Sequence, residues 1–184
     1  MLEYFRSTWN DDWRAFPTWA FWSWTAFFAA FLLYAWSQHG QALFIDSVNL
    51  VVHEAGHALF GWFGATLGLW GGTLFQLIVP FLLAGYFFTQ RQAAAFAFCL
   101  FFLFENFLGI ATYMADARAQ ALPLVTLGDP EFVIHDWNAI FSSLGLLQHD
   151  LQIAAVTRFL GWAGMLGIVI WMAREACRSP KRPQ

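Results

Sequence analysis

The sequence predicts an all-α membrane protein, a polytopic bundle of about five transmembrane helices in a single domain covering residues 1–184. Of these residues 59% are hydrophobic and 11% are charged, whereas a typical soluble domain is about 45–50% apolar and about 25% charged. A soluble fold of this size would leave much of that apolar surface in water, because small domains bury a smaller share of their surface. The lipid bilayer is therefore the first partner that we expect.

Five apolar segments approach the length of about 20 residues that a membrane helix needs. They lie at residues 17–36, 44–63, 67–88, 93–115 and 153–173. The one long polar segment covers residues 116–150, and residues 137–147 within it are typical of a short amphipathic or re-entrant helix. A bent or short second segment would change the number of crossings.

The distribution of charge predicts the orientation of the bundle. Four basic residues lie between Arg174 and Gln184, and cytoplasmic loops of membrane proteins are enriched in Lys and Arg. We expect a cytoplasmic C-terminus and, with five crossings, an N-terminus on the other side. Arg91 fits this scheme, but Arg118 and Arg158 do not. No basic patch is interleaved with aromatic residues, so we expect no nucleic-acid partner.

The second apolar segment carries the motif His53-Glu54-Ala55-Gly56-His57. Histidines four apart in a helix share one face, so both imidazoles can bind one zinc ion at about 2.0–2.1 Å. Glu54 would lie beside the metal, where it can take a proton from a bound water. Because ionisable residues in membrane helices are costly and usually functional, the motif predicts Zn²⁺ as cofactor and Glu54 as catalytic base. The alternative is a histidine pair that only hydrogen-bonds between helices.

A catalytic zinc site needs a third protein ligand and one open position. We expect the third ligand to be His135 or Asp136, with Asp116 or Glu105 as the next candidates. The pair His135-Asp136 could instead cap a helix N-terminus, or the two residues could divide these roles. Glu105 and Asn106 could equally form a hydrogen-bonded packing pair between helices.

Three further positions near the motif have expected roles. Asp46 and Asn49 lie on the helical stripe of His53, so either could orient a histidine through its second ring nitrogen. Gly56 permits close approach of another helix or of a substrate backbone. Gln76 and Pro80, in the third apolar segment, could expose backbone groups to a substrate, but we favour a proline kink as the interpretation.

The stretch Val52 to Ala58 resembles the HExGH signature of the intramembrane zinc metalloproteases, the site-2 protease family. The resemblance implies zinc on His53 and His57, Glu54 as base, and hydrolysis of a peptide bond within or beside the membrane. It also implies a bacterial protein of the inner membrane. That family takes its third ligand from an Asp-Gly pair in a later helix. This chain has no Asp-Gly, and His135-Asp136-Trp137 is the nearest equivalent.

Three functions are open on the sequence alone. The first is a membrane-embedded zinc hydrolase, an intramembrane metalloprotease whose partner is a transmembrane peptide substrate. The second is a non-catalytic accessory subunit or assembly factor, whose partner is another protein of a larger membrane complex. The third is a zinc-dependent lipid amidase.

Overall fold

The computed structural model describes residues 12–14, 17–123 and 134–178. Over these residues the chain is helical and contains no strand. The helices are α2 (Thr18–Ser37), α3 (Asp46–Gly61), α4 (Ala65–Thr89), α5 (Ala93–Ala115), α6 (Asp136–Ser143), the 3₁₀ turn η2 (Leu147–His149) and α7 (Asp150–Arg178). The predicted short helix near 137–147 is thus α6.

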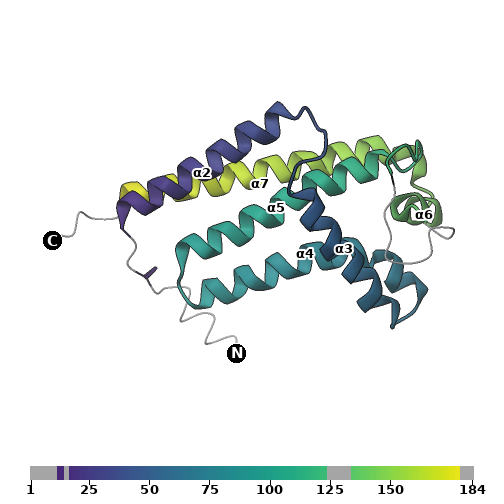
Figure 1. Ribbon diagram of the computed structural model, residues 1–184, viewed down its shortest axis with the longest axis horizontal. Coiled ribbons are helices and arrows are strands. Elements are labelled where there is room, and N and C mark those ends of the chain that lie inside the picture. Colours follow the sequence, from purple (N-terminus) through teal and green to yellow (C-terminus); the bar gives the residue numbers. More distant parts are fainter. Residues whose placement is uncertain (1–11, 15–16, 124–133, 179–184) are drawn as a thin grey trace.

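Four long helices lie side by side in the order α2, α7, α5, α4 (Figure 1). Helices α2, α4 and α5, together with the continuous stretch Leu147–Cys177, are long and apolar enough to cross a membrane. Helix α3 crosses α4, and α6 lies where α5 ends and α7 begins (Figure 1). The expectation of a membrane-spanning helical bundle is therefore supported.

The predicted number of crossings is wrong, because the segment 44–63 forms only the 16-residue helix α3. At 1.5 Å per residue, α3 is about 24 Å long, which is shorter than the apolar core of a bilayer at about 30 Å. It also carries Asp46 and Glu54 beside its two histidines. The structure therefore has four candidate spans rather than five.

With an even number of spans, the first span should begin on the same side of the membrane on which the last span ends. The ring of Trp13, just before α2, lies 5.5 Å from that of Trp171 in the last part of α7. The backbone N–H of Arg14 donates to the carbonyl of Arg91, between α4 and α5, at 2.9 Å. The start of the first span and the end of the last lie at one end of the bundle, contrary to our prediction of opposite sides.

At the opposite end of the bundle lies Arg118, one of the two arginines that do not fit the predicted orientation. An ion pair accounts for its position. The Arg118 Nε atom lies 2.8 Å from the buried carboxylate of Asp150, at the first residue of α7. The charge of Arg118 is therefore neutralised by Asp150. For this reason Arg118 is a weak argument against the orientation that the other arginines favour.

Glycines bring α3 close enough to α4 to build a site between them. A Cβ atom at Gly71 would lie 2.6 Å from the carbonyl oxygen of Gly56, and one at Gly56 would collide with the carbonyl of Gly71. Small residues allow such close backbone approach between membrane helices. The next residue of α4, Gly72, leaves room for the ring of His53. Gly56 therefore serves helix packing, one of the two roles expected for it.

Candidate metal centre

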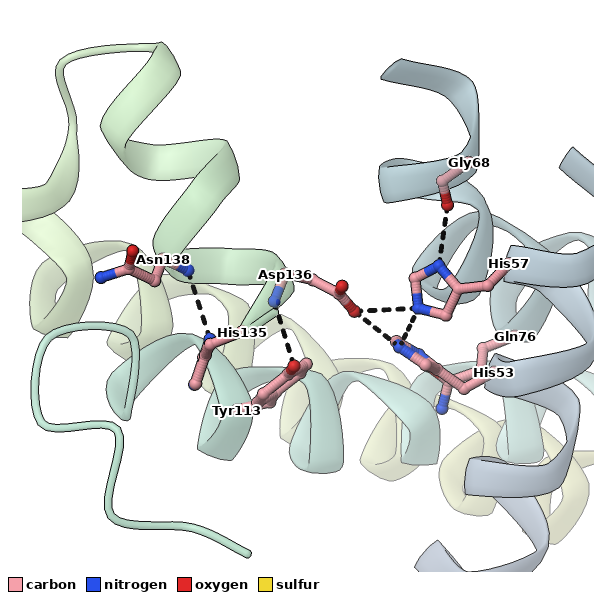
Figure 2. A network of polar contacts seen from close by, with 8 residues as sticks. All are labelled: His53, His57, Gly68, Gln76, Tyr113, His135, Asp136 and Asn138. Atoms are coloured by element: carbon pink, nitrogen blue, oxygen red, sulfur yellow. Dashed lines mark hydrogen bonds and ion pairs between the residues drawn. The ribbon is translucent and has the colours of Figure 1, made fainter. Parts of the chain in front are cut away.

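Two histidines of α3 and one aspartate of α6 converge on a single point (Figure 2). The Nε2 atoms of His53 and His57 lie 3.0 Å apart. The Asp136 Oδ2 atom lies 2.8 Å from the first and 3.0 Å from the second. Within the described part of the chain, these three residues are the one group whose ligand atoms are close enough to share a metal ion.

Local structure brings each of the three side chains to this point. Histidines at positions i and i+4 of α3 face the same way, as the motif predicts. Asp136 is the first residue of α6, and its backbone N–H donates to the hydroxyl of Tyr113 in α5 at 3.1 Å. The site therefore joins α3, α5 and α6, which are distant in sequence.

His135 caps helix α6 and does not join the metal group. Its Nδ1 atom accepts a hydrogen bond from the backbone N–H of Asn138 at 3.2 Å. Its Nε2 atom lies 3.4 Å from the carboxylate of Asp116. Burial lowers the pKa of His135, although Asp116 opposes this shift. Of the two candidates for a third ligand, the structure places Asp136 beside His53 and His57 and gives His135 the capping role.

The outer nitrogens of the two histidines bind groups that can only accept hydrogen bonds. His53 Nδ1 lies 2.7 Å from the side-chain oxygen of Gln76, and His57 Nδ1 lies 2.7 Å from the backbone oxygen of Gly68. Both Nδ1 atoms must therefore carry protons. In the neutral rings, both Nε2 atoms then present lone pairs to each other and to the carboxylate of Asp136.

With both rings neutral, three electron-rich atoms at this separation repel one another unless a proton or a metal cation lies among them. Tetrahedral coordination with bonds of about 2.0–2.1 Å would place the ligand atoms about 3.3–3.4 Å apart. The observed separations of 2.8 to 3.0 Å are a few tenths of an ångström shorter. Two neutral imidazoles and one carboxylate also form a donor set that zinc prefers. The residues therefore fit a zinc ion with a small outward adjustment.

The two fallback ligands bind other groups. The Asp116 oxygens accept from the backbone N–H groups of Ala121 and Leu122 at 2.9 and 3.0 Å, which closes the turn after α5. Glu105 is buried in α5, and its Oε2 atom accepts from the side chain of Asn49 at 3.0 Å. Neither carboxylate belongs to the group formed by the histidines and Asp136.

Asp46 and Asn49, which we expected to orient a histidine, bind other groups in this structure. Asp46 accepts from the backbone N–H of Leu43 at 2.7 Å, at the start of α3, and Asn49 is bonded to Glu105. The histidines are oriented instead by Gln76 and by the carbonyl of Gly68. The sequence contained an indication that Gln76 has a polar partner, because an amide within an otherwise apolar membrane helix requires one. A backbone carbonyl such as that of Gly68 leaves no such signal in a sequence.

The group formed by His53, His57 and Asp136 opens into a cavity of about 990 Å³ between α3, α4 and α5. Its lining includes Glu54, which is half-buried, and the apolar side chains Leu50, Leu69 and Ile110. This volume is at the upper end of the range of about 300–1,000 Å³ for ligand pockets. A carboxylate beside a metal group, on the wall of such a cavity, can act on a bound molecule.

No family model matches this chain, and no curated protein or solved structure is significantly similar to it. Its function is therefore inferred from the geometry and chemistry of the site.

Proposed function

We propose that this protein is a membrane-embedded zinc hydrolase, an intramembrane metalloprotease in which His53, His57 and Asp136 hold the metal. The observation that carries the proposal is the convergence of their three ligand atoms, each within 3.0 Å of the other two. With both rings neutral and Nδ1 protonated, the lone pairs of the two Nε2 atoms face the space between them, which suits a cation. When bound there, zinc would supply a Lewis acid and lower the pKa of a bound water to about 7.

Glu54 would act as the general base. It follows His53 in α3 and reaches the same cavity. Its carboxylate can take a proton from the water whose oxygen attacks the carbonyl carbon of the substrate. It can then return that proton to the amide nitrogen as the C–N bond breaks, which leaves a carboxylic acid and an amine. Removal of a general base typically costs about 10²–10⁴-fold in rate.

The shape and lining of the cavity favour an apolar, extended segment as the substrate. Helices α3, α4, α5 and α6 contribute apolar side chains to its wall, and a transmembrane peptide brings the matching apolar surface. The amide to be cleaved must be free of helical hydrogen bonds, because a nucleophile cannot reach a carbonyl enclosed in a helix. The substrate class that we propose is therefore a transmembrane segment that unwinds locally.

The arginines support an orientation for the bundle. Arg14, Arg91 and Arg174 lie at the end where α2 begins and α7 finishes. By the preference of basic residues for the cytoplasmic side, we propose that this end faces the cytoplasm of a bacterial inner membrane. The metal group lies at the other end of α5, close to Tyr113. The site would then act near the outer surface of that membrane.

A pair of matched variants tests the proposed function. Glu54→Gln removes the base, and Glu175→Gln makes the same change near the other end of the bundle. Both should retain about one zinc ion per chain. Peptides released from membranes should disappear only with Glu54→Gln, as measured by mass spectrometry.

Other outcomes of this experiment would overturn the proposal. Wild-type protein that purifies without zinc would favour the accessory subunit. Release of lipid amines in place of peptides would favour the lipid amidase. An unchanged set of peptides with Glu54→Gln would reject Glu54 as the base.

A further inference from the structure

A buried chain of side-chain amides connects α5 to the outer nitrogen of His53. The side-chain nitrogen of Asn106 donates to the carbonyl of Phe102 at 2.8 Å. The side-chain nitrogen of Gln76 donates to the oxygen of Asn106 at 3.3 Å. The oxygen of Gln76 then accepts from His53 Nδ1 at 2.7 Å. Gln76 and Asn106 are 8% and 1% exposed, so water does not compete for these bonds.

The direction of this chain is set at its backbone end. The carbonyl of Phe102 can only accept, so the nitrogen of Asn106 must face it and its oxygen must face Gln76. That oxygen can also only accept, so Gln76 must turn its nitrogen toward Asn106 and its oxygen toward His53. Each group thus determines the orientation of the next, and the last bond requires a proton on Nδ1 of His53.

We propose that Gln76 and Asn106 are positioning residues that hold His53 in its metal-binding tautomer. This inference rests on the proposed function, because it concerns a ligand of the proposed zinc. If the amide of Gln76 turned over, its nitrogen would donate to Nδ1 of His53. The ring proton would then move to Nε2 and point at His57 and Asp136, where it would block coordination.

His57 provides an internal comparison. Its Nδ1 atom donates to the backbone carbonyl of Gly68, which can only accept and therefore needs no further group to orient it. A glutamine has one accepting and one donating end, so it requires a second residue to choose between them. That is the role of Asn106.

The test is the zinc affinity of four variants, measured by competition with a chromophoric chelator. Gln76→Leu should weaken zinc binding by about 10–100-fold, the usual effect of losing a partner of a metal-binding histidine. Gln76→Glu should keep most of the affinity, because both carboxylate oxygens accept. Asn106→Leu should weaken binding, because the amide of Gln76 is then free to turn over.

The double variant Gln76→Glu with Asn106→Leu decides the matter. Both oxygens of a glutamate at position 76 can accept from Nδ1 of His53, whichever way the carboxylate is turned. Loss of Asn106 should therefore cost no zinc affinity in the Gln76→Glu variant. A merely structural role of Asn106 would give the same loss in both backgrounds and would overturn the inference. Gln76→Glu that binds zinc no better than Gln76→Leu would also overturn it. The melting temperature of each variant identifies any that fails to fold.

Failure of this inference is distinguishable from failure of the proposed function. A wild-type protein that binds no zinc would overturn both. A wild-type protein that binds zinc, with Gln76→Leu binding it equally well, would overturn only the role of the amide chain.

Discussion

Substitution of Gly72 by alanine should disturb the metal centre without removing any ligand. A Cβ atom at this position of α4 would lie 2.6 Å from the Cδ2 and Cε1 atoms of His53 and would collide with Nε2. Ordinary contacts of a Cβ atom begin at 3.4 Å, which is 0.8 Å more than the 2.6 Å to these two carbons, so the imidazole or the helix must move by at least about 0.8 Å. Metal–ligand distances tolerate only about 0.2 Å, so the ring cannot make this movement and keep its place in the site.

The expected magnitude follows from the cost of adding a methyl group to a tightly packed position, typically about 1–3 kcal/mol. If that strain is released when His53 leaves the metal, zinc binding should weaken by about 5- to 150-fold. The assay is chelator competition on the purified protein in detergent.

Gly85→Ala is the matched control for this substitution. It lies on the same helix, and a Cβ atom there would meet nothing within 4 Å. Its zinc affinity should equal that of the wild type. Equal affinities for the Gly72→Ala and Gly85→Ala variants would refute the packing of His53 against α4.

Further measurements test the site and the orientation. Asp136→Ala should abolish measurable zinc binding, whereas His135→Ala should keep zinc and lose about 1 kcal/mol of stability with its helix cap; the reverse would exchange their roles. Glu105→Gln should leave zinc content unchanged, because the residue is bonded to Asn49, and a loss of zinc would implicate Glu105. Saturation with zinc at 100 times its Kd should stabilise the fold by about 2.7 kcal/mol, seen as a rise in Tm that a chelator reverses; an unchanged Tm would contradict the site. A membrane-impermeant maleimide should label the exposed Cys177 in inverted vesicles and not in intact cells after outer-membrane permeabilisation; the opposite pattern would reverse the orientation.

The sequence alone determined the lipid environment and the pairing of the two histidines of the motif. An excess of apolar residues with few charges cannot be buried in a small soluble fold, so the membrane followed from composition. His53 and His57 were predictable as a pair because helical periodicity is a local property. The position of Asp136 near them was predictable only as one of four alternatives, since loop closure across more than 70 residues leaves no local pattern.

Tertiary structure decided the remaining features, because each depends on contacts between distant segments. Segment 44–63 has the composition of a span, but its helix ends at Gly61 and crosses α4 at a pair of glycines. His135 and Asp136 are neighbours with similar chemistry, and only the direction of α6 turns one toward the cap and the other toward α3. The partners of the histidines come from α4, through an amide and a backbone carbonyl. Spacing along the chain cannot show which of several buried polar groups will meet, because that depends on how the helices cross.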